Sequence, residues 1–142
     1  MIGDPPPPRL DTGETNIDFA YNGVFRRVPG LYFANKQGTN AWIAFVSNTE
    51  VSATPNARLQ YNEKNGKTNG TGLLTFVNDG STLDLSRVRI TEGSFGSCPV
   101  PGSPSTDDVA RRGECGSAAF TIGDGGGVLT VRPRPTVITG GQ

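Results

Sequence analysis

The sequence predicts an all-β chain folded as one antiparallel β-sandwich of the jelly-roll kind. Short apolar runs alternate with polar residues, as in half-buried strands. The 20 glycines and 11 prolines place turn formers at short intervals. No window of about eleven residues has the apolar spacing of a helix. A length of 142 residues fits one domain. We expect an extended Pro-rich arm at 1–14, the β-domain at 15–138 and a Gly-rich tail at 139–142.

The first strands are predicted around a tight turn. Residues 17–21 alternate apolar and polar side chains, which indicates a half-buried strand. Asn22-Gly23 is a strong hairpin signal, so 24–28 is expected to return antiparallel to it. Pro29-Gly30 is predicted to end that strand, because both residues interrupt strands. A separate short strand is expected at 31–33.

Four further strands are expected at 41–46, 57–62, 73–77 and 82–91. The run 41–46 is apolar on both faces, which is typical of a central buried strand. Residues 62–70 are predicted to be a polar loop with two Asn-Gly turns. Within 82–91 the apolar residues change parity, and a bulge near Ser86 would return them to one face.

The C-terminal part is predicted to be a hairpin. Residues 118–122 and 128–132 flank a glycine-rich turn, and 136–138 is a last short strand. Alternation along all the strands predicts a core of Phe19, Trp42, Ile43, Phe45, Leu59, Leu74, Phe76, Leu85, Ile90, Phe120, Leu129 and Val131.

Composition removes many chemical functions. The chain has no histidine, which excludes a Ser-His-Asp triad and any His-ligated zinc site. With 13 basic and 13 acidic residues the net charge is zero, which argues against a nucleic-acid binder. Asp107, Asp108 and Glu114 are interpreted as a solvated loop. We therefore expect no catalytic residue, no metal and no cofactor.

Cys98 and Cys115 are separated by 17 positions. They are either free thiols or a disulfide, and the sequence leaves this open. A disulfide would close a loop rich in Pro and Gly and stabilise the fold by about 3 kcal/mol. It would also indicate an oxidising environment, either extracellular or on the outside of a virion.

Two groups of residues are predicted to contact a partner. The proline run favours a stiff polyproline II arm, which can lie along a neighbouring surface. The arginine pairs have period-2 spacing, so each pair would project from one face of its strand, and neighbouring strands would make a stripe. The contact residues are Pro5, Pro6, Pro7, Pro8, Arg9 and Leu10 in the arm, and Arg87, Arg89, Arg132 and Arg134.

An aromatic platform for sugars is a weaker hypothesis. It would use Trp42, Tyr21, Tyr32 and Tyr61. However, Trp42 lies in the most apolar strand, and Tyr21 and Tyr61 have the inward parity. Most of these rings are therefore expected in the core.

Two functions fit these features. The first is a non-catalytic structural protein that docks on a major capsid or other lattice protein as a dimer or trimer. In size and character the chain is similar to phage capsid decoration or cement proteins, which implies a place on the virion exterior. The alternative is an extracellular binding module of the carbohydrate-binding, adhesive or pilin type. No secretory signal peptide and no membrane span are expected.

Overall fold

The computed structural model describes residues 14–34, 39–96, 98 and 113–133. In these ranges the chain forms eleven β-strands and one short 3-10 turn, so the predicted all-β class is confirmed. Glu14, predicted as the end of the arm, already belongs to the first strand. The strand predicted at 136–138 lies outside the described residues.

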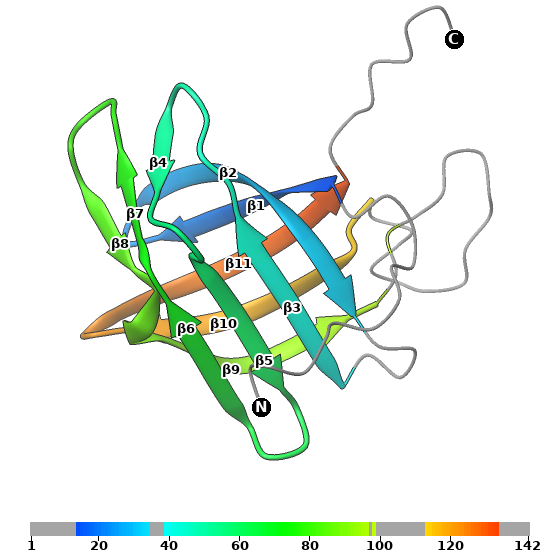
Figure 1. Ribbon diagram of the computed structural model, residues 1–142. Helices are drawn as coiled ribbons and strands as arrows, with labels where there is room; N and C mark the ends of the chain where they lie inside the picture. The colour runs from blue at the N-terminus through cyan, green and yellow to red at the C-terminus, as the bar shows by residue number, and fades with distance from the viewer. Residues whose placement is uncertain (1–13, 35–38, 97, 99–112, 134–142) are drawn as a thin grey trace, which may run out of the picture.

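Eight of the strands form one antiparallel sheet that curls into a nearly closed barrel (Figure 1). The first strand lies between the second and the last, so strands from opposite ends of the sequence are hydrogen-bonded to each other. In spatial order the strands are β6 (Lys67–Thr71), β5 (Arg58–Asn62), β3 (Asn40–Phe45), β2 (Val24–Ala34), β1 (Glu14–Tyr21), β11 (Gly125–Pro133), β10 (Gly116–Ile122) and β9 (Val88–Phe95).

The barrel is brought close to closure where β6 approaches β9 and the turn before it. The backbone N–H of Ile90 donates to Thr68 Oγ1 at 2.8 Å. Gly70 lies so near the backbone that a Cβ there would be 1.8 Å from the carbonyl oxygen of Leu85. Only glycine permits this approach, so the seam depends on close packing in place of a hydrogen-bonded ladder.

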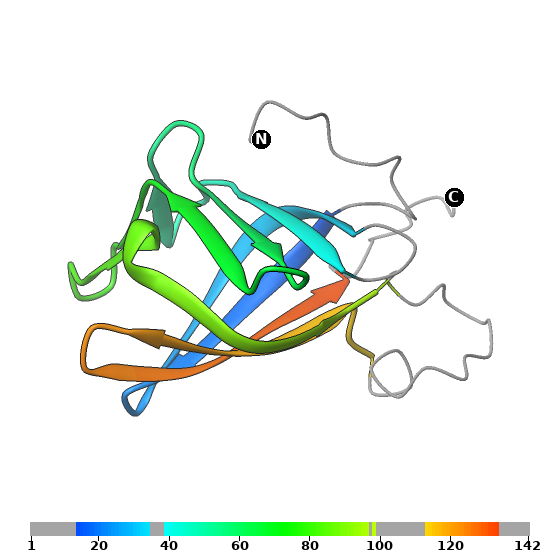
Figure 2. The ribbon, with the colours of Figure 1, turned by 90° about the horizontal axis from the view of Figure 1, so that it is seen from below.

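The other three strands form a small second sheet with the order β4 (Val51–Ala53), β7 (Leu73–Phe76) and β8 (Thr82–Asp84). Figure 2 shows this sheet at one end of the barrel, beside the β1–β2 and β10–β11 turns. We call this the hairpin end. The opposite end, where β9 leads to Cys98, is the disulfide end.

Inward-facing side chains of both sheets fill one hydrophobic core. Every predicted core residue except Trp42 is buried. In β3 the side chains of Ala41, Ile43 and Phe45 point inward, so period-2 alternation places Trp42 on the outer face. The prediction for Trp42 was wrong because the outer face of this strand is apolar as well.

The predicted hairpins are present. Asn22 and Gly23 both have positive φ, 51° and 77°, as a two-residue turn of type I′ requires. The C-terminal hairpin turns at Gly123, which also has positive φ.

Three local predictions were wrong. The run Pro29-Gly30 does not end a strand, because β2 continues through it with β1 on one side and β3 on the other. The polar loop predicted at 62–70 contains β6, which pairs with β5 along its length. The bulge near Ser86 is a 3-10 turn, η1 (Leu85–Arg87), which carries the chain from the small sheet to the barrel.

The jelly-roll sandwich is not confirmed. Eight strands belong to one curved sheet and three to the second, whereas a jelly roll divides its eight strands between two sheets.

Candidate functional site

A group of exposed apolar side chains lies at the hairpin end. We call Ala20, Val24, Phe25, Val77 and Val128 the Phe25 patch. Phe25 is 59% exposed and Val77 is 65% exposed. Ala20 stands opposite Phe25 on one side and Val128 on the other, so three of these residues form a row across β2, β1 and β11. Large apolar groups left in water together are typical of a surface that meets another molecule.

An open hollow of about 390 Å³ adjoins the patch. Phe25, Phe76 and Val77 supply apolar walls, and Glu50 and Asn78 supply polar ones. A second, more open hollow lies along the β1–β2 turn and is also lined by Phe25. Phe25 therefore lines two depressions, where a partner could enclose it.

Arg26 ties the small sheet to β2 beneath the hollow. Its guanidinium lies 4.9 Å from the centre of the Phe76 ring. Its Nη2 donates to Asp79 Oδ2, and also to Ser81 Oγ at 3.2 Å. Hydrogen bonds from Ser81, then the bond from Arg26, lower the pKa of Asp79 to about 2. Burial raises the pKa of the nearby Tyr21, although Arg26 opposes this effect.

A charged network borders the patch on the outer face of β1. Arg27 donates through Nε to Asp18 Oδ1 at 2.7 Å and through Nη2 to Oδ2 at 2.9 Å. Arg132 approaches the same carboxylate at 3.3 Å and Glu114 at 3.7 Å. The hydrogen bond to Asp18 raises the pKa of Arg27. Two-point contacts of this kind hold a guanidinium in a fixed orientation.

The predicted arginine stripe does not form. Arg87 belongs to η1 and Arg89 to β9, while Arg132 belongs to β11, and β10 lies between β9 and β11. Arg89 donates to the carbonyl oxygens of Ser86 at 2.8 Å and Val88 at 3.0 Å. The predicted stripe required the strands that carry the two arginine pairs to be neighbours. They are not, because β10 lies between β9 and β11.

The remaining predicted contact residues, Pro5, Pro6, Pro7, Pro8, Arg9, Leu10 and Arg134, lie outside the described residues. Asp107 and Asp108 also lie there, and Glu114 interacts with Arg132 as given above.

The aromatic residues proposed as a sugar platform are not brought together on the surface. Tyr32 and Tyr61 are buried inside the barrel, where each ring packs against Phe95. Tyr21 is half-buried and packs against Phe120. Trp42 is half-buried on the outer face of β3, where it stands opposite Phe33 of β2 and not opposite Phe25. The exposed ring that sequence reasoning missed is Phe25.

Cys98 and Cys115 are joined by a disulfide. The bond lies at the end of the barrel where the backbone N–H of Gly96 donates to the carbonyl of Cys115 at 2.9 Å. Tyr32 Oη donates to the carbonyl of Gly96 at 2.6 Å. The disulfide therefore holds the segment after β9 against the start of β10.

Within the described ranges no group of three or more His, Cys, Asp and Glu side chains is arranged to hold a metal ion. The same ranges contain no helix with the length and apolar character that a membrane crossing would need. Comparison of the chain with family models, with curated proteins and with solved structures gave no match.

Proposed function

We propose that the protein is a non-catalytic structural protein that docks on a protein lattice, of the kind that decorates and stabilises a phage capsid. The observation that carries the proposal is the Phe25 patch, an exposed apolar surface whose ring lines two hollows. Isolated exposed rings of this kind commonly become the buried anchors of protein interfaces.

The surroundings of the patch support the same function. Protein interfaces have an apolar centre, a polar rim and an excess of arginine. Arg26 and Arg27 lie beside Phe25 and are held by Asp79 and Asp18 respectively. Because the side chains are already ordered, less entropy would be lost when a partner binds.

The sequence predicts a jelly-roll sandwich, but the proposed function does not depend on that architecture. The barrel presents an exposed patch for attachment, and the predicted Pro-rich arm would be a second means of attachment. The partner would be a major capsid protein or another lattice protein, the chain would associate as a dimer or trimer, and its place would be the virion exterior.

A carbohydrate-binding or adhesive module is the second candidate. The hollow beside Phe25 combines an exposed ring with Glu50 and Asn78, and small-molecule sites often pair an apolar wall with a few polar groups. The disulfide is in keeping with an extracellular place.

Cosedimentation separates the two candidates. The probe is a shell assembled from the major capsid protein of the genome that encodes the chain. We expect the chain to sediment with the shell and Phe25→Ser to weaken this binding at least about tenfold, because truncating an anchor is costly. Val46→Ser is the matched control, since Val46 is 42% exposed but lies outside the patch.

No binding of the unaltered chain to the shell would contradict the lattice function. Binding to a glycan array that is lost in Phe25→Ser, by a chain whose mass in light scattering is that of a monomer, would establish the second candidate instead.

A further inference from the structure

The hollow of about 390 Å³ beside the Phe25 patch is lined by an acidic residue, Glu50, and we call it the Glu50 hollow. Glu50 is exposed, and no ion pair or hydrogen bond among the described residues involves its carboxylate. Its backbone is held, because the N–H donates to Asn48 Oδ1 at 2.8 Å and the carbonyl accepts the N–H of Val77 at 2.9 Å. The small sheet therefore fixes the position of Glu50 and leaves its carboxylate available to a partner.

The two arginines that line the same hollow already have carboxylate partners. Arg26 is paired with Asp79, and Arg27 makes the two-point contact with Asp18. Each guanidinium charge is thus opposed by a carboxylate within hydrogen-bond distance. Glu50 adds a third carboxylate to these two pairs, so the hollow and its border carry an excess of negative charge. A basic side chain of a partner would meet a complementary potential there.

The walls of the hollow also fit a basic side chain. Phe25, Phe76 and Val77 supply apolar surface beside Glu50. Lys and Arg place their methylene stems along apolar surface while the charged group stays at a polar one. Of the two, Arg is the less strongly hydrated and stacks on aromatic rings. The ring of Phe25 is 59% exposed, which leaves it surface on which a guanidinium can lie.

We propose that the Glu50 hollow binds an arginine side chain of the docking partner, with the guanidinium on Glu50 and the stem against Phe25 and Val77. This inference rests on the proposed function, because it names the chemistry that the lattice protein presents to the Phe25 patch. Docking encloses the ion pair between the two proteins. A partner without a basic side chain at this point would leave Glu50 covered and unpaired, so the pair determines which partner docks.

A peptide probe tests the hollow without a lattice. The probe is acetyl-Gly-Arg-Gly-amide, and the comparison is the same peptide with citrulline, which has the shape of arginine without its charge. In the full-length protein we expect the arginine peptide, at millimolar concentration, to shift the NMR signals of the Val77 methyl groups and the Phe25 ring along a saturating curve. The citrulline peptide should bind about fivefold more weakly, because it forms no ion pair.

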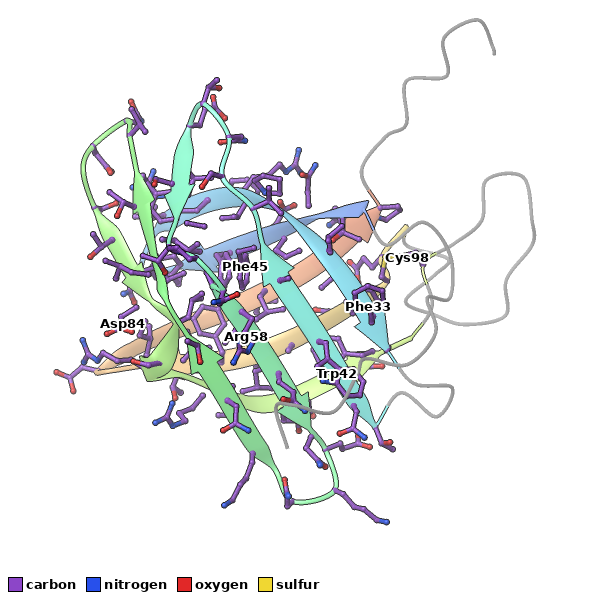
Figure 3. The ribbon with its side chains drawn as sticks, viewed as in Figure 1. Phe33, Trp42, Phe45, Arg58, Asp84 and Cys98 are labelled. Atoms are coloured by element: carbon purple, nitrogen blue, oxygen red, sulfur yellow. A yellow bond between two sulfur atoms is a disulfide. The ribbon has the colours of Figure 1, made fainter. Side chains whose placement is uncertain are left out.

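The variant Glu50→Gln keeps the shape of the side chain and removes its charge, so it should abolish the preference for arginine over citrulline. Glu63→Gln is the matched control, because Glu63 is also exposed but lies in the β5–β6 turn and does not line the hollow. Trp42 is a control for contact of the peptide with aromatic rings in general. It lies on the outer face of β3 (Figure 3), and its ring signals should not move.

The capsid shell tests the same pair in the complex. In cosedimentation Glu50→Gln should weaken binding about fivefold relative to the unaltered chain, and Glu63→Gln should leave it unchanged. Added salt should weaken binding of the unaltered chain more than binding of Glu50→Gln, because salt screens an ion pair.

Equal binding of the arginine and citrulline peptides, or a preference for arginine that persists in Glu50→Gln, would overturn the proposal. Tighter binding of acetyl-Gly-Lys-Gly-amide than of the arginine peptide would overturn the choice of arginine. Shell binding that Glu50→Gln leaves unchanged would also overturn the proposal, while the lattice function would stand. The expected peptide results without any shell binding would support the arginine site and contradict the lattice function, so the two failures are distinguishable.

Discussion

The two ends of the barrel use aromatic side chains in opposite ways. At the disulfide end, the ring of Phe95 packs 6.4 Å from Tyr32 and 5.9 Å from Tyr61, and all three are buried. At the hairpin end, the described ring contacts of Phe25 consist of one group, the guanidinium of Arg27, which lies 5.9 Å from the ring centre. Phe95 contributes its apolar surface to folding, whereas Phe25 leaves most of its ring exposed to solvent.

The same substitution at each end should therefore have very different effects. Phe95→Ala removes a buried ring and leaves a cavity, so we expect the free energy of unfolding to fall by about 3–5 kcal/mol. Phe25→Ala removes a ring that is 59% exposed, and we expect a loss below about 1 kcal/mol. Urea unfolding of both variants, followed by circular dichroism, measures the difference.

The two substitutions should have the opposite order of effect on docking. Phe25→Ala should impair docking on the capsid shell, whereas Phe95→Ala should leave docking intact wherever the variant is folded. Equal destabilisation by the two substitutions would mean that Phe25 supports the fold and that the hairpin end is not set aside for a partner.

The disulfide end has a second source of stability. The bond between Cys98 and Cys115 closes a loop over a separation of 17 positions, which corresponds to about 3 kcal/mol in the chain-entropy model. We expect the double variant Cys98→Ala and Cys115→Ala to lose about this much unfolding free energy.

Thiol titration of the denatured, unreduced protein provides the control, and it should detect no free thiol. Two titratable thiols, or equal urea midpoints for the variant and the parent, would contradict a stabilising bond. Docking of the double variant should equal that of the parent, because the Phe25 patch lies at the opposite end.

Local patterns in the sequence predicted much of this architecture. Alternation identified the inward side chains of the strands, and Asn22-Gly23 fixed the first hairpin and its register. That register also predicts that the side chain of Phe25 lies on the outer face of the sheet. A two-residue turn places Phe25 opposite Ala20 and Arg26 opposite Phe19, so the ring must point outward while the arginine points inward.

Non-local contacts could not be predicted in the same way. The barrel depends on β1 pairing with β11, which joins segments from opposite ends of the chain, and local periodicity carries no information about this pairing. Pro29-Gly30 was misjudged because pairing on both sides outweighs the interruption, and Gly30 gives the space that the carbonyl of Ala44 needs. Trp42 was misjudged because apolar residues occupy both faces of β3.

The smallest effect concerns the charge that fixes the turn beside the Phe25 patch. Asp79 accepts hydrogen bonds from Ser81 and from Arg26, and its pKa falls from 3.8 to about 2. A carboxylate with a lowered pKa stabilises the folded state above its unfolded pKa, and this contribution is lost as the pH falls through the folded pKa. The parent should thus have a higher melting temperature than Asp79→Asn at pH 7, and the gap should close between about pH 4 and pH 2.

Asp84→Asn is the matched control for this charge. Asp84 makes the same kind of turn with Ser86, and its lowered pKa has the same first cause. Asp84 makes no described bond to Arg26, whereas Asp79 connects the β7–β8 turn to β2 through that residue. Added salt should narrow the gap for Asp79→Asn more than for Asp84→Asn, because an exposed ion pair is screened. Equal salt effects in the two variants would show that the serine turn, and not the ion pair to Arg26, accounts for the role of Asp79 beside the patch.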